Sequence, residues 1–176
     1  MSSPGPSSLA AVLLVLCSFS FAAVVAGGHR AIAGKPDTPT LAGAWTLVAA
    51  DVLHPDGTRG RDYGASPHGL LLIDASGRYS VQIYKSERPR FAAKDKAGGT
   101  PEEFQSAVLG SSCHFGRLEV DAAGKSLIFH IQGSSYPNWE GTEQVRRFEL
   151  EGDELSYRVP PRPNGDVPLS TWRRTP

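Results

Sequence analysis

Cysteine is nearly absent from this chain of 176 residues, which has only Cys17 and Cys113. Cys17 lies in an apolar N-terminal run, and Cys113 alone cannot form an internal disulfide, so the sequence predicts no disulfide framework. The chain also has no net charge, because its 18 basic and 18 acidic residues balance. A neutral chain lacks the basic face that binds nucleic acids or anionic membrane surfaces, and we expect neither as a partner.

Sequence motifs of high specificity are missing as well. The chain has five histidines: His29, His54, His68, His114 and His130. They show no His-x-His or His-Glu-x-x-His spacing, so no metal site is predicted. No Gly-x-Ser-x-Gly, phosphate loop or dinucleotide fingerprint is present, and we expect no cofactor. Cys113 and His114 are adjacent, but neighbouring side chains of a strand point to opposite faces, which argues against a catalytic pair.

The N-terminus has the pattern of a secretory signal. Residues 9–25 are almost wholly apolar and small residues follow them, which indicates cleavage after Ala26. The alternative is an uncleaved membrane anchor, although the run is shorter than the roughly 20 residues of a spanning helix. We predict a signal peptide at residues 1–26, a secreted or periplasmic mature protein without a membrane span, and a flexible arm at residues 27–40.

From residue 41 onward, short runs with alternating apolar side chains are separated by turn residues, which is typical of an all-β domain. Eight strands are predicted, at residues 41–53, 69–74, 78–84, 114–121, 126–132, 143–151, 154–159 and 169–174. An open sheet of eight sequential hairpins would leave two unpaired edges, and closure removes them. We therefore predict that residues 41–176 form an eight-stranded antiparallel up-and-down β-barrel.

One short helix is predicted after the third strand. Residues 100–103, Thr-Pro-Glu-Glu, form a capping box with a proline in the first turn, and Gly110 ends the helix. We expect the helix to cover one mouth of the barrel. The long charged loop before it, residues 85–99, is either a functional lid or a solvated connection.

Several stretches resemble a known family. Gly43-Ala44-Trp45 resembles the Gly-x-Trp signature of lipocalins, and Trp172-Arg173-Arg174 supplies the arginine that lipocalins pack over that tryptophan. Together with residues 80–83, 88–91, 98–103, 115–120 and 137–146, these stretches are similar to the bacterial and fungal lipocalin-like domain family. The resemblance implies a calycin-type barrel. It implies little about activity: some lipocalin-shaped relatives bind apolar ligands, and a few are similar to cyclases or isomerases.

Polar residues in the middle of predicted strands are the candidates for the lumen. His130 and Arg146 each stand among apolar residues on neighbouring strands, which predicts a cross-strand pair facing the interior, with His130 neutral. A buried Arg146 would need a carboxylate or an acidic ligand. Gln82 and Tyr84 either share this lumen or face solvent. Trp139, in a turn, either gates the mouth or packs over the rim.

Three functions follow from these residues. The one we favour is a non-enzymatic barrel that binds a small, mostly apolar molecule through Gln82, Tyr84, His130, Arg146 and Trp139. The second is a cofactor-free isomerase or cyclase in which His130 is the base and Arg146 stabilises negative charge. The third is a structural or interaction module with a filled barrel. The contents of the lumen distinguish the three.

Overall fold

Nine strands, one α-helix and two short 3-10 helices follow one another along residues 40–176, the part of the chain that the computed structural model describes. They are β1 (Gly43–Leu53), β2 (Arg59–Gly60), β3 (His68–Ile73), β4 (Arg78–Tyr84), η1 (Lys96–Gly98), α1 (Pro101–Leu109), β5 (Ser111–Asp121), β6 (Ser126–Ser134), η2 (Pro137–Trp139), β7 (Glu143–Glu151), β8 (Glu154–Arg158) and β9 (Val167–Arg174). The predicted signal peptide, and all of the predicted arm except residue 40, lie outside the described residues. Among residues 40–176, no helix has the length and apolar character to cross a membrane.

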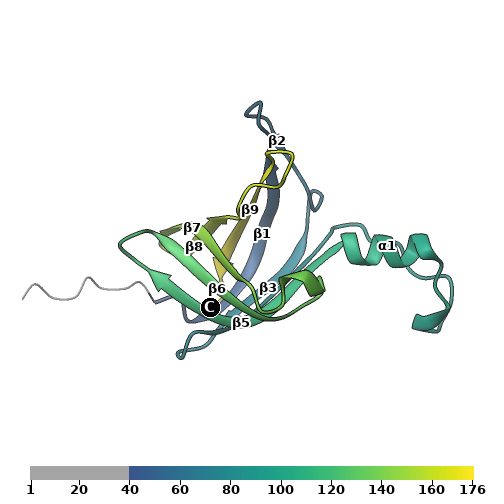
Figure 1. Cartoon of the computed structure of the whole chain (residues 1–176), viewed down its shortest axis with the longest axis horizontal. Coiled ribbons are helices and arrows are strands. Elements are labelled where there is room, and N and C mark those ends of the chain that lie inside the picture. Colours follow the sequence, from purple (N-terminus) through teal and green to yellow (C-terminus); the bar gives the residue numbers. More distant parts are fainter. Residues whose placement is uncertain (1–39) are drawn as a thin grey trace, which may run out of the picture. The chain divides into compact units, whose positions relative to one another are not determined.

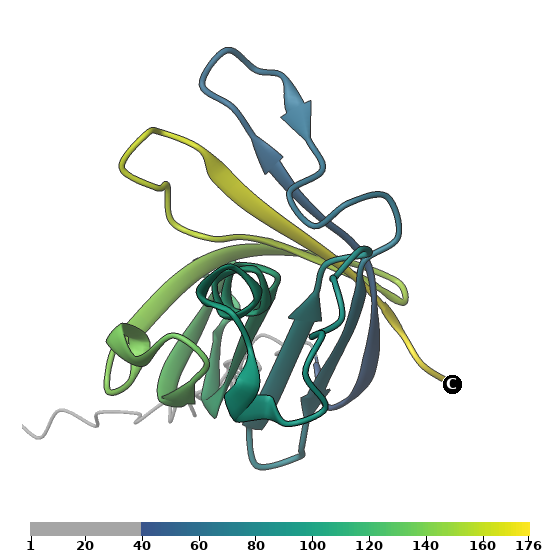
Figure 2. The same cartoon turned by 90° about the vertical axis from the view of Figure 1, so that its right-hand side faces the viewer.

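The strands form a closed antiparallel barrel (Figures 1 and 2). Apart from β2, strands that follow one another in the chain pair with each other, and β1 also pairs with β9, which closes the sheet. The two-residue β2 pairs only with the far end of β1, so eight strands make up the barrel. This confirms the predicted fold. The additional strand β2 was not predicted and shifts the numbering by one. The helix, predicted after the third strand, therefore follows β4.

Alternation along each strand separates the core from the surface. On β4, Tyr79, Val81 and Ile83 are buried, whereas the residues between them are only half-buried. Apolar side chains fill the interior because their burial contributes about 25 cal/mol for each Å² of apolar surface removed from water. The largest fully buried side chains are Trp45, Trp172, Tyr157, Phe129, Leu71, Leu127, Leu155 and Val81.

One end of the barrel is closed by Trp45. The Trp45 indole is fully buried and donates a hydrogen bond from Nε1 to the carbonyl oxygen of Leu41 at 2.9 Å. The Arg174 guanidinium lies 4.1 Å above the centre of the indole ring and donates hydrogen bonds to the backbone carbonyls of Ala42 and Thr40. This is the lipocalin-type pairing of tryptophan and arginine.

The neighbouring signature residues have different roles. Gly43 has a φ of +135°, and a Cβ there would lie 3.1 Å from Arg174 Nη1, which favours glycine. Trp172 is fully buried in the core. The exposed Arg173 instead pairs with Glu154 at 3.4 Å.

The other end of the barrel carries the long connections. At the Trp45 end, β3–β4, β5–β6 and β7–β8 are joined by short turns at residues 74–77, 122–125 and 152–153. At the opposite end, the connections at residues 54–67, 85–110, 135–142 and 159–166 are longer. We call this second end the open end. Loops there can surround a ligand without disturbing the strands.

Helix α1 stands at the open end but does not cover it. It begins with the predicted capping box, in which Thr100 Oγ1 accepts from the Glu103 amide and Glu103 accepts from the Thr100 amide. None of its residues is buried, and Figure 1 shows it extending away from the strands. The expectation of a covering helix is therefore wrong. The reason is that Phe104 packs on Phe91 of the preceding loop, at 5.3 Å between ring centres, and not on the barrel.

Candidate functional site

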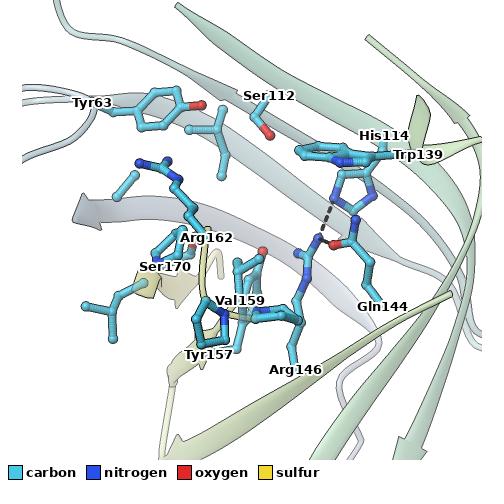
Figure 3. A pocket seen from close by; sticks show the side chains of 16 residues that line it. Tyr63, Ser112, His114, Trp139, Gln144, Arg146, Tyr157, Val159, Arg162 and Ser170 are labelled. Carbon is cyan, nitrogen blue, oxygen red and sulfur yellow. Dashed lines mark hydrogen bonds between the residues drawn. The ribbon is translucent and has the colours of Figure 1, made fainter. Parts of the chain in front are cut away.

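A cavity of about 360 Å³ opens at the open end of the barrel (Figure 3). Its size lies in the range of small-molecule sites. Strands β1, β4, β5, β7, β8 and β9 contribute lining residues, as do η2 and the connection between β8 and β9. Most of the wall is apolar or aromatic. The buried polar side chains in it are His114, Arg146, Tyr157 and Ser170.

Arg146 is the buried charge of this cavity. Its residue is only 4% exposed, because alternation along β7 places it on the inner face with Gln144 and Phe148. Arg146 Nη2 donates to Gln144 Oε1 at 2.7 Å and to His114 Nε2 at 3.0 Å. The guanidinium also lies over the Phe129 ring, 4.2 Å from its centre.

These neutral partners do not replace a counter-charge. A cation–π contact contributes about 0.5–2 kcal/mol, whereas taking a guanidinium out of water costs several kcal/mol. Burial lowers the pKa of Arg146, but a guanidinium stays protonated at pH 7. The cavity therefore carries one buried positive charge.

His114 is held as a neutral imidazole with a fixed tautomer. Because arginine has no acceptor, His114 Nε2 must accept the hydrogen bond from Arg146, and the ring proton is then on Nδ1. His114 Nδ1 donates to Tyr79 Oη at 2.8 Å. Burial, helped by the nearby Arg146 charge, lowers the pKa of His114 to about 3. The lone pair of its Nε2 is occupied, so the imidazole is not a free base.

The two phenols beside Arg146 are neutral as well. Burial raises the pKa of Tyr157, and it raises the pKa of Tyr79 beyond its usual range. Neither phenol therefore supplies a phenolate to balance Arg146 at pH 7. The Tyr157 hydroxyl is buried, and within residues 40–176 it has no hydrogen-bond partner.

The rim of the cavity is formed by loops. Trp139 of η2 packs edge-on against His114, with 6.0 Å between ring centres. Arg162, in the connection between β8 and β9, forms an ion pair with Asp62. A hydrogen bond of 2.8 Å between His54 Nδ1 and Asp166 Oδ1 joins the same connection to the end of β1. These contacts hold the loops around the opening.

The structure corrects the predicted position of His130. It lies on the outer face of β6, with its side chain 40% exposed and its ring nitrogens near Glu119 and Glu143. The register places His130 opposite Glu143, and Leu127 opposite Arg146. The predicted pair of His130 and Arg146 does not form, because turning the wholly apolar face of β6 inward buries more apolar surface.

The other predicted ligand residues divide between the two faces. Gln82 and Tyr84 lie on the outer face of β4, since Tyr79, Val81 and Ile83 occupy its inner face. Their predicted place in the lumen is therefore also wrong. Arg146 and Trp139 do line the cavity. Among residues 40–176, no group of three His, Cys, Asp or Glu side chains could hold a metal ion.

Sequence reasoning missed His114, although a signal was available. On β5, Phe115, Arg117 and Glu119 form a face that carries charge and belongs outside, so His114 must share the inner face with Leu118. Gln144 could have been found in the same way, two residues before Arg146. Tyr63 and Arg162 lie in loops, which have no alternating pattern from which the direction of a side chain could be predicted.

Comparison with known proteins identifies the class of this barrel. The chain belongs to the lipocalin-like domain family, whose model matches residues 42–175. It is also similar to the 4'-hydroxy-3'-methoxypropiophenone carrier protein of Aspergillus oryzae, with 32% identity over 107 residues. That match covers 55% of this chain and 96% of the relative.

The buried His114 predicts a pH dependence of stability. The imidazole has a pKa of about 3 in the folded chain, compared with an ordinary value of 6.5. Between these values the unfolded state binds more protons, so stability falls as the pH falls below 6.5, by about 1.4 kcal/mol per pH unit. Urea unfolding between pH 6.5 and 5 measures this slope.

Two glutamine variants assign the slope to one histidine. His114→Gln should lose most of the slope, because no proton is then taken up on unfolding at that position. His130→Gln is the matched control on the outer face and should keep it. If His114→Gln retained the full slope, the neutral buried imidazole would be contradicted.

Proposed function

We propose that the protein is an exported carrier that holds one small, mostly apolar aromatic molecule in the cavity at the open end. The single observation that carries this proposal is the cavity of about 360 Å³, with apolar walls and a few inward polar groups. An aromatic ligand fits a wall that contains Tyr63, Trp139 and Tyr157. The similar carrier protein of Aspergillus oryzae, named for an aromatic ketone, supports the same ligand class.

The two other functions have less support. An isomerase or cyclase needs a base in the cavity. His130 lies outside it, and the Nε2 lone pair of His114 already accepts from Arg146. A filled barrel would leave no room for a ligand, whereas a cavity of about 360 Å³ is present here. A carrier is therefore the function that this geometry favours.

Blocking the cavity is expected to abolish binding. Ser112 lines the cavity, whereas its neighbour Cys113 lies on the other face of β5. Ser112→Phe should reduce affinity for 4'-hydroxy-3'-methoxypropiophenone at least tenfold, because the ring occupies the ligand's space. Calorimetric titration measures this. Cys113→Phe adds a similar bulk outside and should bind like the wild type; equal loss in both variants would place the site elsewhere.

Export is the second part of the proposal. It is based on the apolar run at residues 9–25, which small residues follow. Sequencing of the N-terminus of protein isolated from its natural source should begin near Gly27. An intact N-terminal Met1 on soluble protein inside the cell would refute export and leave the binding function untouched.

A further inference from the structure

The cavity has a charge that its own walls do not balance. Arg146 and Arg162 are its charged lining residues, and among the described residues no Asp or Glu lines it. The Arg162 charge is already compensated, because Asp62 forms an ion pair with it. The unbalanced charge is therefore that of Arg146.

Arg146 differs in this respect from three other arginines of the barrel. Arg59, Arg173 and Arg174 are all more exposed, yet each has a carboxylate within 3.5 Å, from Asp51, Glu154 and Asp153. Arg146 is the buried one, and within residues 40–176 its hydrogen bonds go to a neutral imidazole and an amide. The residue that most needs a counter-charge lacks one.

Unused hydrogen-bonding capacity lies at the same place. Both hydrogen bonds of Arg146 leave from Nη2, and its buried Nε has no partner in the described part of the chain. The buried Tyr157 hydroxyl also has none, and its ring lies 5.2 Å from the guanidinium carbon. Buried polar groups rarely lack hydrogen-bond partners, and a ligand in the adjoining cavity is one source of a partner for this cation.

We infer that the ligand of this cavity carries an ionised acidic oxygen, a carboxylate or an acidic phenolate, that pairs with the Arg146 guanidinium. The inference rests on the proposed carrier function and specifies its ligand as a small amphipathic anion. The aromatic body lies against Trp139 and the apolar wall, and the acidic oxygen accepts from Arg146. The neutral Tyr157 ring lies beside the guanidinium, with its centre 5.2 Å from the guanidinium carbon.

A matched pair of probes tests the charge. Cinnamate and cinnamamide have nearly the same shape, but only the first is ionised at pH 7.5. Calorimetric titration of the wild type should give at least tenfold tighter binding of cinnamate, because a charge-assisted pair is stronger than a neutral hydrogen bond. In Arg146→Met the two affinities should become equal, and Arg146→Lys should restore part of the preference.

The outcomes separate the inference from the function on which it rests. If cinnamamide binds as tightly as cinnamate, or if Arg146→Met keeps the preference, the inference is overturned. The carrier function survives that result if 3',4'-dimethoxypropiophenone, which has no ionisable group, binds to the wild type and not to Ser112→Phe. If the acid, the amide and the ketone all fail to bind, both proposals are refuted.

Discussion

Trp45→Ala is expected to lower the free energy of unfolding by about 3–5 kcal/mol, the usual cost of truncating a fully buried aromatic side chain. Trp45 has no exposed surface, and its indole donates to Leu41 and supports Arg174. Alanine leaves a void at the closed end and removes the ring under the guanidinium. The surrounding strands are closed into a barrel, so they cannot collapse far into the void.

Chemical denaturation of the wild type and two variants measures this effect. Trp139→Ala is the matched control, because Trp139 lies at the rim of the open end and is only partly buried. Its cost in stability should be clearly smaller than that of Trp45→Ala. A loss below about 1 kcal/mol for Trp45→Ala would show that this end of the barrel is not held by the indole.

Arg146→Met is expected to have the opposite effect on stability. It should raise the free energy of unfolding of the ligand-free protein by about 1–3 kcal/mol. Replacing a buried charge by an apolar side chain of similar length removes the desolvation cost, which often stabilises a protein. The acceptors that lose their donor, His114 and Gln144, line the cavity, where water can replace it. The arginine would then serve binding at the expense of stability.

A second arginine provides the contrast. Arg174 donates to two backbone carbonyls and covers Trp45, so Arg174→Met should lower the free energy of unfolding by about 2 kcal/mol. Denaturant unfolding of both variants tests the two signs together. If Arg146→Met destabilised the ligand-free barrel as much as Arg174→Met does, Arg146 would be part of the scaffold.

The barrel could be predicted from the sequence because the alternation that defines its strands is local. Turn residues and period-two patterns indicate eight strands, and the capping box indicates α1. The same alternation places Arg146 correctly, since Phe148 beside it has to face the core. Among the described strands, only the very short β2 escapes prediction, because two residues show no recognisable period.

The site was harder to predict because it depends on which strand face turns inward and on loops. On β6 both faces contain apolar residues, and the face without His130, which is wholly apolar, is the one that turns inward. Strand β5 carries a clearer signal, and it points to His114. The positions of Tyr63 and Arg162 come from long connections whose course is set by tertiary contacts such as the Asp62 ion pair.

The most direct test of the carrier proposal is to map where a ligand binds on the barrel. In a nuclear magnetic resonance titration with 4'-hydroxy-3'-methoxypropiophenone, the indole signal of Trp139 and the ring signals of His114 should shift most. The indole signal of Trp45, at the closed end, and the ring signals of His130, on the outer face, should not move. Saturable shifts at His130 or Trp45 with none at His114 and Trp139 would contradict a carrier site at the open end.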